Sequence, residues 1–331
     1  MNTNCHLLRH LLRRLRPLAL TLAATPLMAH AWTDKPVRIV VPAPAGGTMD
    51  AVARTLSEAV SAEIGQPVIV DNKPGAAGAI GVQALLAAPA DGQTLMFMVS
   101  NILTEIPLVM KTSFDPLKDL KPVTMVARST MVLVGAPAVP ATDLKSLIGY
   151  LKTGKGAPAS YASYSAGTSS HYAGAIFARK AGLDMQHVPY AGSPPALQNV
   201  LGGQVDIMFD GMVTSLPLIK AGKLKVFGVG AGSRLPQLPD VPTLAEQGYA
   251  EIDFSNWAGA IVSAKMPEAL VSRINAVLSK VAASPKVRER LVAQNFIPVI
   301  SESPAQLSKI THDEYERNAQ IVKTYQIQLN P

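Results

Sequence analysis

Cysteine is nearly missing from this sequence of 331 residues, in which Cys5 is the single example. Cys5 lies in an N-terminal segment that we expect to be removed, so the working protein would have no thiol. Such a chain can form no disulfide bond, no thiolate nucleophile and no cysteine zinc site. Its stability must come from burial alone, which about 300 residues can supply in one large or two medium domains.

An apolar run long enough to cross a membrane is also missing from that N-terminal segment. The run 17–28 has about 12 residues, well short of the ~20 that a spanning helix needs, and two prolines interrupt it. Four arginines and no acidic residue precede it, and Ala29, His30 and Ala31 follow. This order is typical of a cleavable secretion signal, so we predict removal after Ala31 and a periplasmic protein.

A strong basic charge is missing once this signal is removed. The whole chain has 30 basic and 23 acidic residues, but the four arginines of residues 1–31 leave with the signal, which gives 26 against 23. No run of clustered lysine and arginine with interleaved aromatic residues remains. We therefore expect no nucleic-acid partner.

Short β-branched runs alternate with helical patterns after residue 36. We expect strands at 37–41, 68–70 and 95–99 and helices at 50–64 and 80–87. This alternation predicts an α/β fold with a mainly parallel sheet. In the first helix an apolar residue recurs every fourth position, from Val52 to Ile64, with Thr48 as the expected N-cap and Gly65 as the expected end.

A second α/β unit of similar plan follows from residue 131. We expect its elements at 131–134, 144–151, 161–164, 173–181, 187–190, 196–201, 205–209 and 224–229. The last third changes character: a strand at 257–262 precedes helices at 268–282, 287–293 and 305–325, with one short strand at 297–300. We expect these helices to pack back onto the first unit.

That return makes the chain cross between the two units twice, near 127–131 and 256–259. Two crossings predict a hinge. The expected division is therefore a signal at 1–31, a first lobe at 32–130 plus 259–331, and a second lobe at 131–258.

Three strand-to-helix junctions, 42–50, 163–171 and 190–193, are rich in small and hydroxyl residues. Ligands collect at such junctions because unpaired backbone N–H groups and the helix dipole favour negative charge there. Gly46 and Gly47 could admit a ligand close to the backbone or serve only as a tight turn. Asp50 fits a capping role by itself. Asp210 ends a strand that should be buried, where a crevice is expected.

Catalytic constellations are incomplete. Ser169, Ser170, His171 and Asp210 suggest a hydrolase triad, yet no G-x-S-x-G elbow is present, and a serine beside His171 on one helix start is poorly placed to attack with it. The three histidines of the body lack metal-ligand spacing: His171, His187 and His312. Glycines 75, 78 and 81 do not form G-x-G-x-x-G. We predict no catalytic residue, metal or cofactor.

A set of short segments in a fixed order spans essentially the whole predicted mature chain: Lys35 through Val41, Gly46, Gly47, Asp50, Ala53, Arg54, 65–67, 71–75, 90–95, 187–190, 202–206, Phe209, Asp210, 221–223 and 238–243. By these segments the chain resembles the Bug (TctC-like) family of tripartite tricarboxylate transporter receptors. So many ordered matches are far more specific than any single motif.

The resemblance implies a two-lobed fold like that of type II periplasmic binding proteins, with a ligand cleft between the lobes. It implies a monomeric receptor that closes on a small organic acid and offers it to two membrane subunits of a transporter. Backbone amides, hydroxyls and bridging water would hold the carboxylate. The residues carried over by position are Gly46, Gly47, Thr48 and Asp50 in the first lobe, and Ser165, Gly167, Thr168, His171, Tyr190, Ala191 and Asp210 in the second.

One departure from the family pattern falls in the first loop. Family members often carry a bulky aromatic residue and a further proline where this chain has Ala43 and Ala45, which predicts a wider or less covered pocket. Two alternatives stay open: a ligand-binding protein that signals to a membrane sensor, and a periplasmic hydrolase that uses His171 or Asp50 as acid or base.

Overall fold

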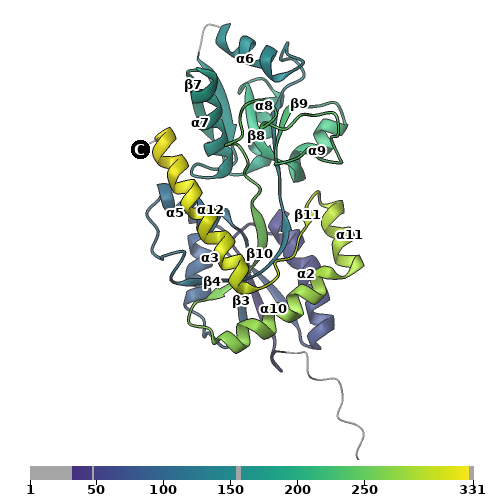
Figure 1. The fold of residues 1–331 in the computed structure, drawn as a ribbon. Helices are drawn as coiled ribbons and strands as arrows, with labels where there is room; N and C mark the ends of the chain where they lie inside the picture. The colour runs from purple at the N-terminus through teal and green to yellow at the C-terminus, as the bar shows by residue number, and fades with distance from the viewer. Residues whose placement is uncertain (1–31, 47, 154–157, 328–331) are drawn as a thin grey trace, which may run out of the picture.

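The computed structural model describes residues 32–46, 48–153 and 158–327, so the predicted signal, Gly47 and the last four residues lie outside the described part. Two lobes are stacked one above the other, each built around one β-sheet with helices on its faces (Figure 1). This is the two-lobed α/β architecture that the sequence predicts.

The first lobe has a six-stranded sheet in the order β11-β4-β10-β3-β1-β2. Its strands are β1 (Val37–Val41), β2 (Val68–Asn72), β3 (Thr94–Val99), β4 (Leu120–Arg128), β10 (Trp257–Ser263) and β11 (Ile297–Pro298). β1 pairs in parallel with β2 and β3. β10 lies antiparallel between β3 and β4, and β11 is antiparallel to β4.

Helices cover both faces of this sheet: η1 (Ala76–Gly78), α2 (Thr48–Ile64), α3 (Ala79–Leu86), α4 (Asn101–Thr104), α5 (Ile106–Val109), α10 (Glu268–Ala283) and α11 (Pro285–Ala293). The predicted stripe of α2 from Val52 to Ile64 is buried in one cluster with β1, α10 and α11, as its spacing predicts. The helix begins at Thr48 rather than at Asp50. The expectation that Thr48 is the N-cap, the residue just before the helix, is therefore wrong by one position.

The second lobe has a five-stranded sheet in the order β7-β6-β8-β5-β9. Its strands are β5 (Met131–Gly135), β6 (Ala159–Ser163), β7 (Met185–Pro189), β8 (Ile207–Gly211) and β9 (Lys225–Gly230), and its helices are α6 (Leu144–Thr153), α7 (Ser169–Ala181), α8 (Ser193–Leu201) and α9 (Met212–Lys220). β6 pairs in parallel with β7 and β8.

Most strands of each sheet run in the same direction, as the alternation predicts, but the sequence did not indicate the antiparallel strand that lies inside each sheet. β5 is antiparallel to β8 and β9, as β10 is to β3 and β4. Both strands directly follow a crossing between the lobes. A strand that enters a lobe from the hinge runs away from it, whereas the strands of the βαβ units end on the hinge side.

A third connection joins the lobes beside the two crossings that the sequence indicates. Helix α12 (Pro304–Tyr325) runs along one side of the molecule from the first lobe to the second (Figure 1). Leu307 near its start is buried with first-lobe residues, and Ile321 near its end belongs to the core of the second lobe. The final helices thus return to the first lobe, but α12 also leaves it again.

Candidate ligand-binding site

The loop between β1 and α2 is held in place by Asp50. The Asp50 carboxylate is buried and accepts hydrogen bonds from the Gly46 amide (2.8 Å), Arg54 Nε (2.9 Å) and Asn72 Nδ2 (3.1 Å). Asn72 Nδ2 also donates to the Ala43 carbonyl at 3.0 Å. The hydrogen bond from Arg54 is the largest of the effects that lower the pKa of Asp50 to about 2. Asp50 is therefore ionised and fixes this loop.

Glycine is required at one position of that loop. Gly46 has a φ of +77°, in the left-handed region, and a Cβ built there would meet nothing within 4 Å. The loop therefore presents open backbone to its surroundings, and its conformation rather than its packing demands glycine. Thr48 is the first residue of α2, and Gly47 lies outside the described residues.

The loop between β6 and α7 also closes on itself. The Gly167 amide donates to His171 Nδ1 at 3.2 Å, and Thr168 Oγ1 donates to the Ser165 carbonyl at 2.7 Å. Gly167 has a φ of +75°. Because His171 Nδ1 accepts a hydrogen bond, the neutral ring carries its proton on Nε2. The loop is thus a rigid turn at the N-terminus of a helix of 13 residues.

Two histidines that lie 16 positions apart in sequence stack face to face beneath this loop. The ring centroids of His171 and His187 are 3.9 Å apart with an interplanar angle of 3°, and Tyr161 stacks on His187 at 5.0 Å. His187 Nε2 lies 2.7 Å from Ser163 Oγ. Burial lowers the pKa of His171 to about 4 and that of His187 to about 3. Both rings are neutral at pH 7, and sequence spacing gave no sign of the pair.

The third junction is tied to the second by its backbone. The Tyr190 amide donates to the Ser163 carbonyl at 2.9 Å, and the Gly192 amide donates to the Tyr164 carbonyl at 2.8 Å. Tyr190 is half-buried and Ala191 is exposed. Parallel pairing of β6 with β7 thus continues past the strand ends and places the two junctions side by side.

Asp210 ends β8 beside these junctions and is fully buried. Its Oδ1 accepts from Ser193 Oγ at 2.5 Å, and its Oδ2 accepts from Thr214 Oγ1 and Ser215 Oγ, both at 2.6 Å. Burial raises the pKa of Asp210, against these hydrogen bonds. The carboxyl group therefore joins the first turns of α8 and α9 to the end of β8.

The predicted second-lobe residues gather at one edge of their sheet, whereas the first-lobe residues form a separate group. Within the described ranges, no hydrogen bond or ion pair joins Gly46 or Asp50 to a second-lobe residue. The first-lobe group is a glycine-containing turn anchored by Asp50, whereas the second-lobe group is two glycine-containing turns anchored by His171 and Asp210. The charged side chains of both groups, Asp50 and Asp210, form hydrogen bonds with residues of their own lobe.

A buried contact between the lobes was not foreseen from the sequence. Glu105, between α4 and α5 of the first lobe, accepts a hydrogen bond from the Ser169 amide of α7 through Oε2 at 2.5 Å. Asn256, in the second crossing, donates to Ser169 Oγ at 2.7 Å. Burial raises the pKa of Glu105 to about 7. The sequence feature that could have indicated this contact is a lone acidic residue in an otherwise apolar segment, directly before Ile106 and Pro107.

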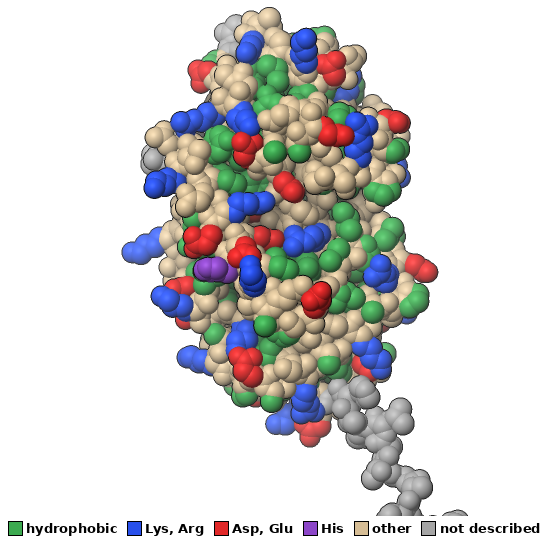
Figure 2. Space-filling model, viewed as in Figure 1, with side chains coloured by type: hydrophobic (Ala, Val, Ile, Leu, Met, Phe, Trp, Pro, Cys, Tyr) green, Lys and Arg blue, Asp and Glu red, His purple; other side chains and the backbone are tan. Residues whose placement is uncertain are grey.

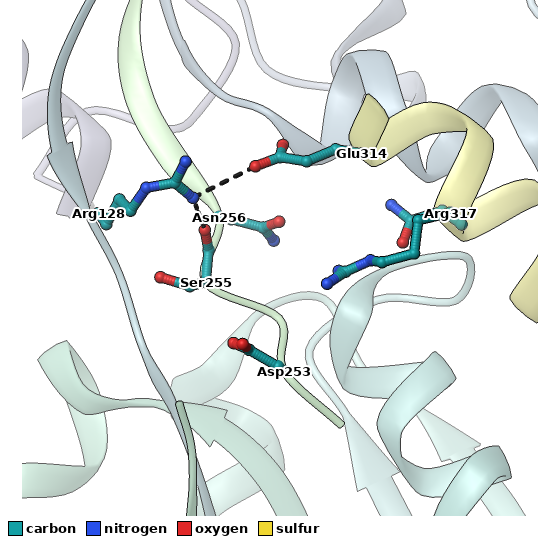
Figure 3. Close-up of a pocket in the computed structure, with 7 residues that line it drawn as sticks. Arg128, Asp253, Ser255, Asn256, Glu314 and Arg317 are labelled. Carbon is teal, nitrogen blue, oxygen red and sulfur yellow. Dashed lines mark hydrogen bonds and ion pairs between the residues drawn. The ribbon is translucent and has the colours of Figure 1, made fainter. Parts of the chain in front are cut away.

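A small polar pocket lies where the second crossing passes α12 (Figure 3). Its volume is about 100 Å³, and its lining residues are Arg128, Asp253, Ser255, Asn256, Glu314, Arg317 and Asn318. Arg128 Nη1 lies 3.2 Å from Glu314 Oε1 and also donates to the Ser255 carbonyl. Acidic and basic side chains gather across the middle of this face (Figure 2). The volume suits a few water molecules better than a C6 acid.

Two further searches concern only the part of the chain that the structure describes. There, no group of three or more histidine, cysteine or acidic side chains is arranged to hold a metal ion. In the same ranges no helix combines the length and apolar character needed to cross a bilayer.

Comparison with known proteins gives one consistent family. Residues 52–327 match the model of the tripartite tricarboxylate transporter family receptor. Protein BugT of Bordetella pertussis (strain Tohama I) is 32% identical over 302 residues, which cover 91% of this chain and 92% of BugT.

Two solved structures from Rhodopseudomonas palustris share the fold. Rpa4515 with adipate is 28% identical, with a TM-score of 0.81 and coverage of 90% of this chain and 99% of Rpa4515. MatC (Rpa3494) with bound malate is 29% identical, with a TM-score of 0.77 and coverage of 87% and 99%. The chain therefore belongs to the tripartite tricarboxylate transporter receptor family, a Bug (TctC-like) family of two-lobed solute-binding proteins.

Proposed function

We propose that this protein is a periplasmic receptor that captures a small organic acid for a tripartite tricarboxylate transporter. The observation that carries the proposal is the match, over 87% and 90% of the chain, to relatives whose structures contain malate and adipate. Export by the predicted signal at 1–31 would place the receptor outside the inner membrane.

The two glycine turns supply the chemistry that such a receptor needs. A carboxylate between the lobes would be bound by backbone amides at the starts of α2 and α7, where both helix dipoles favour negative charge. Among the predicted site residues, none is a lysine or arginine. Neutral donors bind an acid without a buried ion pair, whose desolvation would offset much of the gain.

The predicted site residues fall into two roles in this proposal. The residues that would line the ligand are Gly46, Gly47, Thr48, Ser165, Gly167, Thr168, Tyr190 and Ala191. Asp50, His171 and Asp210 hydrogen-bond to the turns and would hold them in the binding geometry. Rotation about the crossings would bring the two turns onto the acid and exclude water.

Matched pairs of probes test the carboxylate. Adipate and malate are compared with adipamide and malamide, which have the same carbon chains without the charges, by thermal shift and calorimetry. We expect at least one acid of a C4 to C6 panel to bind and raise Tm, and its amide to fail. Correctly folded protein that no acid stabilises would refute the proposal.

Partner and reaction are tested separately. A sensor role is distinguished by capture of membrane proteins with and without the acid, where transporter membrane subunits are expected. A hydrolase role would require turnover of an ester or lactone that His171→Ala abolishes, and we expect no product from the wild-type protein. The mass of the chain purified from the periplasm should correspond to a start at Trp32.

A further inference from the structure

The Glu105 junction, defined as Glu105, Ser169, Tyr172 and Asn256, is a buried hydrogen-bonded contact between the lobes. Glu105 uses both its side chain and its backbone: Oε2 accepts from the Ser169 amide, and its carbonyl accepts from Tyr172 Oη at 2.9 Å. Both donors lie in the first turn of α7. A single first-lobe residue thus holds the start of a second-lobe helix.

Ser169 is the point where three segments meet. Its amide binds the first lobe, its Oγ accepts from Asn256 Nδ2 of the second crossing, and the same Oγ lies 3.2 Å from Tyr164 Oη, in the loop after β6. Ser169 and Glu105 are fully buried. Solvent therefore does not compete for these hydrogen bonds, and opening the junction would expose a carboxyl group and a helix terminus.

The junction lies at the second crossing between the lobes, where the axis of a hinge rotation would pass. Asn256 belongs to the crossing itself, and Trp257 after it begins β10 and donates from its amide to Ser100 Oγ at 3.2 Å. Helix α12 covers the same place, where Asn318 Nδ2 donates to the Thr104 carbonyl at 2.9 Å. A contact near a hinge axis moves little while the distal parts of the lobes swing.

We propose that Glu105 is a positioning residue that pins the first turn of α7, and with it the turn 165–168, to the first lobe as the pivot of lobe closure. The ligand side of this inference rests on the proposed function, whereas the pivot itself does not. Glu105 acts through Ser169 and touches no ligand. It sets where the second-lobe turn stands relative to the first-lobe turn before an acid arrives.

The protonation of Glu105 makes this positioning role pH-dependent, which a role in packing alone would not be. The pKa of Glu105 is raised from 4.5 to about 7, chiefly by burial and to a smaller extent by the nearby carboxyl group of Glu314 on α12. Tyr164 and Tyr172 face it from the second lobe, and Arg128 pairs with Glu314 behind it. A carboxyl that binds its proton more tightly in the intact junction makes that junction weaker as the pH rises from about 4.5 to about 7.

The test measures lobe geometry without a ligand. Spin labels on Lys118→Cys and Lys145→Cys, one on each lobe, are introduced with Cys5→Ser, and the distance distribution is recorded at about pH 5 and about pH 8. We expect a narrower distribution at the lower pH in the wild type and no pH response in Glu105→Gln, which keeps a neutral acceptor. The control Glu302→Gln, at an exposed position of the first lobe, should keep the wild-type response.

Removal of the acceptor should loosen the pivot. Glu105→Ala should broaden the distribution at both pH values, speed amide exchange in 169–172 but not in α10, and weaken adipate binding about tenfold, whereas Glu105→Gln stays within about twofold at the lower pH. If Glu105→Ala does not fold, Asn256→Ala serves as the second variant, with a smaller broadening expected. Wild-type distances and exchange in the folded variants would overturn the inference. Absence of adipate binding in the wild type would count against the proposed ligand and leave the distance test in force.

Discussion

Replacement of Asp210 separates a residue that holds the site from one that binds the ligand. The two carboxylate oxygens serve three hydroxyl donors on α8 and α9. Asp210→Ala removes all three acceptor contacts, whereas Asp210→Asn keeps the shape and one acceptor oxygen. The hydroxyls can turn to accept from the new amide, so the asparagine variant is the conservative member of the pair.

The loss of stability caused by Asp210→Ala depends on whether each hydroxyl that loses its acceptor can find another one. Thr214 Oγ1 already lies 3.1 Å from the Gly211 carbonyl and can donate there, and Ser193 is half-buried and can reach water. Ser215 is fully buried and loses its acceptor, which costs about 1–3 kcal/mol. Relief of the buried carboxyl group offsets part of the sum. We expect a loss in the free energy of unfolding of about 1–2 kcal/mol for alanine and less than about 1 kcal/mol for asparagine.

Urea unfolding at pH 7 measures the loss, with an unchanged m-value as the sign that both variants unfold from the same compact state. Adipate calorimetry on the folded Asp210→Asn protein measures binding, which should stay within about threefold of the wild type. An alanine variant as stable as the wild type would show that the hydroxyl network contributes nothing. A stable asparagine variant without adipate binding would show that Asp210 contacts the ligand directly.

Three further predictions concern the turns and the second-lobe core. Asp50→Asn should lower the free energy of unfolding by about 1–2 kcal/mol at neutral pH, a value kept small because Arg54 is half exposed, and should have almost no effect near pH 2. The ionised carboxylate stabilises the fold above about pH 4, and this stabilisation disappears as the pH falls through the folded pKa of about 2. Urea unfolding of both proteins at the two pH values measures the difference. Because His171 and His187 are neutral in the folded protein, the wild type should lose stability as the pH falls from 6.5 towards 4, where the unfolded chain binds protons on these residues first. His187→Gln should make the stability depend less steeply on pH in this range. An unchanged pH dependence would contradict the neutral state of the pair. Gly174→Ala should lower the free energy of unfolding by about 1–3 kcal/mol, because the new Cβ would lie 2.1 Å from a ring carbon of Tyr161. In the control Gly182→Ala the new Cβ meets nothing within 4 Å, so this variant tests backbone strain alone. Equal Tm values for the two variants would argue against close packing of Gly174 on Tyr161.

The strands and helices with strong periodicity could be predicted from the sequence, and weakly patterned ones could not. The strand 37–41 and the apolar stripe of α2 follow from local pattern alone. β4 was missed because Lys121, Pro122 and Thr124 interrupt its apolar residues, although the strand pairs with β10 along its length. α9 was missed because Pro217 lies inside it.

The candidate site was predictable as three junctions but not as a network. Parallel pairing brings the junctions after β6 and β7 together, and this follows from the βαβ pattern. The partners of Asp50 and the stacking of His171 on His187 depend on contacts distant in sequence, which no local pattern contains. For the same reason Glu105 could not be assigned a partner 64 positions away.

The path of α12 has a consequence for the order in which the chain can fold. Ile321 and Ile327 complete a core that also contains Leu133 and Phe177, while Leu307 joins the core around β3 and β4. Neither lobe can therefore complete its core before α12 has packed against it. Contacts between such distant positions make folding slow.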